Sequence, residues 1–105
     1  MNMKPLPPQA SLRELQDYVR EIVVERGFAI QSIHEQFMKL LEECGELAKA
    51  AKHQLKHPSD ALKKEVAFEA ADVLIYILDI ANRFDIDLMQ ALTEKEEVNK
   101  TRSWK

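Results

Sequence analysis

The chain has 105 residues, of which 46% are apolar, and a formal net charge of −3, so it is long enough for one domain with its own core. The slight acidity gives no electrostatic reason to expect duplex nucleic acid as a partner. A single cysteine excludes an internal disulfide and fits a reducing compartment.

Hydropathy and the N-terminal residues bear on localisation. The chain has no apolar run long enough to cross a bilayer. Its first residues are followed by prolines and lack the hydrophobic run of a signal peptide. We therefore expect a cytoplasmic protein with no membrane partner.

The N-terminal segment predicts an arm followed by one helix. Residues 1–10 hold three of the four prolines, so we expect an irregular arm there. Ser11 and Glu14 have the spacing of a capping box, which opens a helix. Gly27 marks the end of that helix.

Three more helices follow. A second capping box, Ser32 to Glu35, opens a longer helix that fades near residues 53–57. The sequence Pro58-Ser59-Asp60 predicts a break and a third helix, which runs to about Phe84. A fourth helix starts at Asp87. Four helices with short connections predict an all-α fold, a largely antiparallel four-helix bundle formed by the whole chain as a single domain.

The apolar side of the second predicted helix is expected to lie in the core. Its members recur at helical spacing: they are Phe37, Leu40, Leu41, Cys44, Leu47, Ala48 and Ala51.

The third predicted helix, within residues 65–83, has an unusual pattern. Its polar residues fall on one narrow stripe, and nearly every other position is apolar. The stripe consists of Glu65, Glu69, Asp72, Tyr76, Asp79 and Arg83. Such a helix should be covered on most sides, partly by another subunit. Because no lysine or arginine lies between Lys64 and Arg83, the carboxylates need a bound cation or raised pKa values; we expect a bound cation.

Carboxylates on the second and third helices have complementary spacing. Glu42, Glu43 and Glu46 share one face of the second helix, and Glu69 and Asp72 are one turn apart on the third. Antiparallel packing would bring four or five carboxylates together, a set of oxygen ligands that suits magnesium or manganese. Taken alone, the first motif is more often an ordinary solvated helix face.

In these residues the sequence resembles the MazG-like all-α nucleotide pyrophosphohydrolases. That family has an EExxE motif, a gap and then ExxD, and this chain has Glu42, Glu43 and Glu46, 22 further residues, then Glu69 and Asp72. The resemblance continues with an apolar DVLIYIL run from Asp72 and with a K-x-x-x-N-x-x-R element. That element consists here of Lys95, Asn99 and Arg102.

The resemblance implies hydrolysis of a nucleoside triphosphate to a monophosphate and pyrophosphate. Glu43, Glu46, Glu69 and Asp72 would ligate Mg²⁺, with Mn²⁺ as a possible substitute. The catalytic group would be Glu42, Glu43 and Glu46, with Glu42 either a further ligand or the residue that orients the attacking water. Three residues of the basic element would bind phosphate: Lys95, Asn99 and Arg102. An ordinary solvated helix end is the alternative for that element.

Two weaker expectations complete the hypothesis. Tyr76 and Asp79 share the stripe of Glu69 and Asp72, so they are candidates for a nucleoside pocket. The wide apolar face predicts a homodimer or homotetramer. A different class of protein remains open: a non-catalytic, self-associating helical bundle whose acidic slot binds metal.

Overall fold

A computed structural model of the chain describes residues 5–102, and these contain helices and no strands. The elements are α1 (Leu12–Glu25), the short 3₁₀ helix η1 (Phe28–Ile30), α2 (Ile33–Lys56), α3 (Asp60–Arg83) and α4 (Leu88–Lys100). The all-α prediction is confirmed. The expected arm at residues 1–10 lies partly outside the described residues.

The helix boundaries follow from local capping chemistry. Both predicted capping boxes form, because Ser11 and Ser32 each accept a hydrogen bond from the amide three residues later and the glutamate there accepts one in return. Ser59 caps α3 in the same way without the reciprocal bond. Gly27, with φ of 77°, ends α1 in the left-handed region, where a glycine has no steric penalty.

The turn between α3 and α4 forms without a glycine. Asp85 adopts φ of 55°, and the amide of Ile86 donates to the carbonyl of Ala81 at 2.9 Å. This is the hydrogen bond of a Schellman motif, with aspartate in the position that glycine usually takes. The predicted turn at residues 85–87 therefore ends α3 and redirects the chain into α4.

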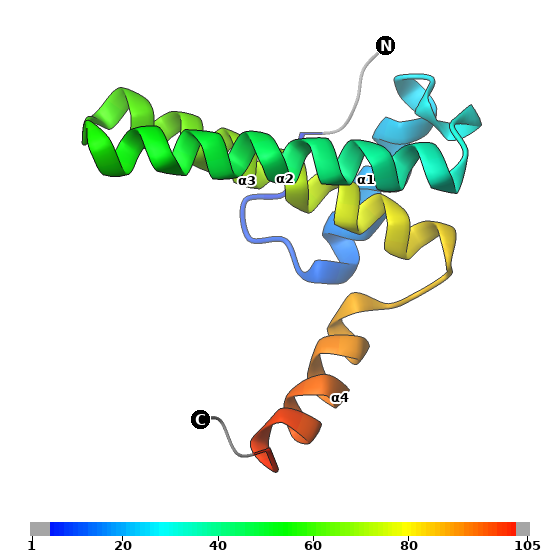
Figure 1. Cartoon of the computed structure of the whole chain (residues 1–105). Coiled ribbons are helices and arrows are strands. Elements are labelled where there is room, and N and C mark those ends of the chain that lie inside the picture. The colour runs from blue at the N-terminus through cyan, green and yellow to red at the C-terminus, as the bar shows by residue number, and fades with distance from the viewer. Residues whose placement is uncertain (1–4, 103–105) are drawn as a thin grey trace.

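The helices are arranged around one long antiparallel pair. α2 and α3 run side by side over most of their length, α1 packs on α3, and α4 packs on α1 and leads away from the pair (Figure 1). The core lies where α1 meets the second half of α3. Its buried members are Val19, Ile22, Val23 and Leu78.

The predicted burial of the apolar side of α2 is wrong for a single chain. Phe37 is 42% exposed, Leu41 is 66% exposed and Cys44 is exposed, whereas the buried residues of α2 are Gln36 and Ala50. The physical reason is that, within the described part of the chain, α2 packs extensively on α3 alone, so α2 is covered along one side. The opposite side carries the larger apolar residues.

The surface of the chain is large for its size. It exposes 8085 Å², whereas a compact monomer of 12.2 kDa exposes about 6,100 Å². Its radius of gyration is 16.1 Å, against about 13 Å for a compact domain of this length. The excess area of about 2,000 Å² comes with exposed apolar residues on α2, α3 and α4.

None of the helices among the described residues is long and apolar enough to cross a membrane.

Candidate metal centre

Three carboxylates from α2 and α3 form a compact acidic group, which we call the carboxylate centre. It consists of Glu43, Glu69 and Asp72, and one oxygen atom from each lies within 4.8 Å of the others. Glu69 and Asp72 are one turn apart on α3 and therefore neighbours. Glu43 joins them because α2 and α3 are antiparallel and pack closely. The predicted meeting of two acidic motifs at a helix pair is thus present for these three residues.

In the part of the chain that the structure describes, no side-chain cation pairs with the carboxylate centre. Burial raises the pKa of Glu43, and the charges of Asp72 and Glu69 raise it further. Close, unneutralised carboxylate oxygens are the ligands that hard divalent cations prefer. The residues therefore fit a divalent cation, which would remove the repulsion among them.

The other two predicted acidic residues lie differently. Glu46 stands one turn beyond Glu43, and its charge contributes to the raised pKa of Glu43, but it is not a member of the close group. Glu42 points to solvent and pairs with Lys39 at 3.6 Å. The predicted roles of both residues, as metal ligand and as catalytic group, stay predictions.

A cavity of about 280 Å³ opens next to the carboxylate centre, and we call it the inner cavity. Its lining comes from α1, η1, α2 and α3 and consists of Ile22, Arg26, Phe28, Glu43, Asp72, Ile75 and Tyr76. Burial and the charge of Glu43 raise the pKa of Tyr76. Its hydroxyl is therefore protonated at neutral pH and can donate a hydrogen bond.

Sequence reasoning found Tyr76 but missed Arg26 and Phe28. These two residues flank Gly27 at the end of α1, far along the chain from both acidic motifs. Their only signal was an arginine and an aromatic residue at a helix end, which is common in any sequence. The crossing of α1 over α3 is what brings them to the inner cavity.

A second cavity, of about 340 Å³, lies on the other side of the carboxylate centre, and we call it the outer cavity. Glu69 belongs to both the centre and this cavity. The lining consists of Glu46, Lys49, Ala50, His53, Leu62, Glu65 and Glu69. The inner cavity, the carboxylate centre and the outer cavity therefore succeed one another along the pair formed by α2 and α3.

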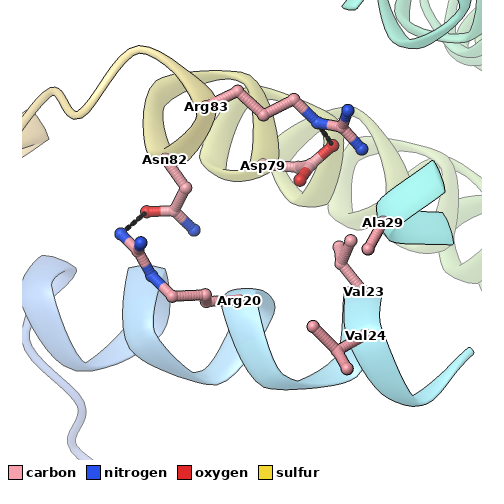
Figure 2. Close-up of a pocket in the computed structure, with 7 residues that line it drawn as sticks. All are labelled: Arg20, Val23, Val24, Ala29, Asp79, Asn82 and Arg83. Carbon is pink, nitrogen blue, oxygen red and sulfur yellow. Dashed lines mark hydrogen bonds and ion pairs between the residues drawn. The ribbon is translucent and has the colours of Figure 1, made fainter. Parts of the chain in front are cut away.

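Asp79 does not line the inner cavity. It is 4% exposed and accepts hydrogen bonds from Gln36 at 2.7 Å and from Arg83 at 3.0 Å. Arg83 also donates to the carbonyls of Gln31 and Phe28. Figure 2 shows this ion pair at a different pocket, between α1 and the end of α3. The pair holds η1 against α3. Asp79 is therefore connected to the inner cavity indirectly, because Arg83 binds the backbone of Phe28, which lines it.

The predicted phosphate-binding residues lie on or next to α4. Lys95 and Asn99 are within α4, and Arg102 follows its end. Because α4 packs on α1 and leads away from α2 and α3 (Figure 1), a single chain does not bring these residues to its own carboxylate centre. Their phosphate-binding role stays a prediction.

Comparison with known proteins shows a match to a family model and similarity to a phage protein. A family model described as the MazG nucleotide pyrophosphohydrolase domain matches residues 31–103, which include both acidic motifs and the basic element. A protein of Cyanophage S-2L named dATP/dGTP diphosphohydrolase is 39% identical over 66 residues. The match covers 63% of this chain and 52% of the phage protein, so the chain spans about half the length of that relative.

Proposed function

This chain belongs to the MazG nucleotide pyrophosphohydrolase family, and from that premise we propose that it hydrolyses a nucleoside triphosphate to a nucleoside monophosphate and pyrophosphate. The observation that carries the proposal is the carboxylate centre, with three ligand oxygens within 4.8 Å of one another and no ion pair to them among residues 5–102. Glu43, Glu69 and Asp72 would hold a divalent cation, Mg²⁺ or its substitute Mn²⁺, with Glu46 beside them. The cation would offset phosphate charge during attack by water.

The different linings of the two cavities support one orientation of the bound substrate. The inner cavity has an apolar floor of Ile22 and Ile75 and the hydroxyl of Tyr76, which suits a nucleoside. The outer cavity is lined mainly by charged and polar side chains and includes Lys49 and His53. We therefore place the nucleoside in the inner cavity, the bond between the α and β phosphates at the carboxylate centre, and the leaving pyrophosphate toward the outer cavity.

The similarity to the phage protein suggests a substrate class. That relative is named for dATP and dGTP. We accordingly propose purine deoxynucleoside triphosphates as substrates of this chain.

A second copy of the chain would complete the protein. The excess of about 2,000 Å² per chain over a compact monomer would give a dimer an interface in the range of permanent homodimers. The exposed apolar residues of α2 and α3 would supply it: Phe37, Met38, Leu41, Phe68, Leu74 and Ile77. In such a homodimer or homotetramer, α4 of one copy could bring Lys95 and Asn99 to the carboxylate centre of another.

Release of pyrophosphate tests the function. Purified protein is incubated with the four deoxynucleoside and four ribonucleoside triphosphates, with Mg²⁺ or Mn²⁺, and both products are measured. Residues that only support a metal ligand contribute roughly 10- to 100-fold to the activity. Glu69→Gln removes a proposed ligand and should therefore reduce the rate by more than this. Glu21→Gln is the matched control, because Glu21 is exposed on α1 and lines neither the inner nor the outer cavity. If no nucleotide yields pyrophosphate, the non-catalytic self-associating bundle is the better account.

A further inference from the structure

Among residues 5–102, Arg26 is the one positively charged residue that lines the inner cavity. It is the C-cap residue of α1, and its backbone amide donates to the carbonyl of Ile22. Within residues 5–102 its guanidinium makes no ion pair or hydrogen bond, neither with Glu43 or Asp72 in the same cavity nor with any other residue. Its donors are therefore available to a molecule that enters the cavity.

Arg26 reaches the inner cavity from the end of α1, whereas the carboxylates come from α2 and α3. The phosphates belong at the carboxylate centre, where Glu43 and Asp72 form one end of the inner cavity. The ring of Phe28 follows Arg26 two residues later in η1. Phe28 is 44% exposed, and its carbonyl is held by Arg83 at 3.0 Å. An aromatic face on an anchored turn is a stacking surface that accepts any base, and a base stacked there would share the inner cavity with Arg26.

The hydrogen-bonding pattern of arginine selects among bases. A guanidinium has only donors, arranged as a fork. Guanine presents two neighbouring acceptors, O6 and N7, and arginine pairs with both. Adenine presents N7 as an acceptor but a donor amino group at C6, which opposes the second donor of arginine.

We propose that Arg26 donates hydrogen bonds to O6 and N7 of guanine in the inner cavity, so that this chain prefers dGTP to dATP. The inference rests on the proposed function. A two-bond pair of this kind is worth about 5- to 140-fold in discrimination, from 1–3 kcal/mol at 1.4 kcal/mol per factor of ten.

Steady-state kinetics with matched nucleotides test the inference. The values of kcat/KM are measured for dGTP, dATP and 7-deaza-dGTP, which lacks the N7 acceptor. For the unmodified protein we expect dGTP to exceed dATP by about 5- to 140-fold, and 7-deaza-dGTP to lose part of that advantage. Arg26→Gln should reduce or reverse the preference, because glutamine can pair with N6 and N7 of adenine. It should also remove the difference between dGTP and 7-deaza-dGTP.

Arg20→Gln is the matched control. Arg20 is also an exposed arginine of α1, but it pairs with Asn82 at 3.3 Å and lines the pocket shown in Figure 2 rather than the inner cavity. Its replacement should leave the ratio of dGTP to dATP unchanged. Hydrolysis of both purines at equal efficiency overturns the inference and leaves the proposed function standing. An equal loss for all nucleotides in Arg26→Gln also overturns it, because Arg26 would then contact phosphate or sugar. Absence of hydrolysis of every nucleotide overturns the proposed function, and this inference with it.

Discussion

We expect the Asp72→Asn variant to be more stable than the unmodified protein without metal and less stable than it when metal is added. The substitution keeps the shape of the side chain and removes one of the three charges of the carboxylate centre. Each pair of charges at 4.8 Å repels by about 0.9 kcal/mol even in a water-like dielectric. Removing Asp72 eliminates two of the three pairs, or about 1.7 kcal/mol, and salt at 0.1 M reduces this to roughly 1 kcal/mol.

The expected shifts are large enough for a melting experiment. In EDTA, Asp72→Asn should melt about 4–8 °C above the unmodified protein, since about 1 kcal/mol has this effect in a domain of this size. With Mg²⁺ at 100 times its Kd, the unmodified protein should gain about 2.7 kcal/mol. The variant, having lost a ligand, should gain much less and become the less stable of the two.

The assay is thermal unfolding followed by circular dichroism, in EDTA and over a series of Mg²⁺ and Mn²⁺ concentrations. Protein concentration is kept constant, because association between copies also shifts the melting temperature. Glu21→Gln serves as the control for loss of a negative charge away from the centre and should respond to metal as the unmodified protein does. A variant that is less stable than the parent in EDTA, or equal stabilisation of both by metal, would refute the reasoning.

Three further predictions concern stability, pH and association. Arg83→Met leaves Asp79 buried without its ion-pair partner and should lower the free energy of unfolding in urea by about 3–5 kcal/mol; a loss below 1 kcal/mol would contradict it. Because the pKa of Glu43 is raised in the folded state, its charge destabilises the metal-free protein at neutral pH. The gain in stability from Glu43→Gln in EDTA should therefore be larger at pH 7 and disappear as pH falls below its ordinary value of 4.5; an equal gain at both pH values would exclude this cause. Leu41→Glu places a charge on the exposed side of α2, where Leu41 is 66% exposed, and should shift the protein toward monomers in sedimentation velocity; an unchanged sedimentation coefficient would place the interface elsewhere.

The helices were predictable because their signals are local. Ser11, Ser32 and Ser59 each cap the helix that the sequence predicts at that point. Capping involves a side chain and an amide three residues apart, so it needs no knowledge of the rest of the fold.

The burial of individual residues was less predictable. Phe37 and Cys44 are at core-like spacing on α2, yet both are exposed in the single chain. Helical periodicity shows which residues share a side of a helix, but not which side meets a neighbour. Asp79 shows the same limit, since its stripe includes Asp72 while its partners are Gln36 and Arg83.

The amino-acid sequence by itself determined four helices, their caps and two acidic motifs, because all of these depend on spacing within a few turns of one helix. Only the tertiary structure decided that Glu43, without Glu46, forms the close group with Glu69 and Asp72, and that Arg26 and Phe28 border the same cavity. The reason is that these neighbours come from separate helices, so their meeting depends on how α2 is rotated against α3 and where α1 crosses them. That geometry is set by packing across the whole chain.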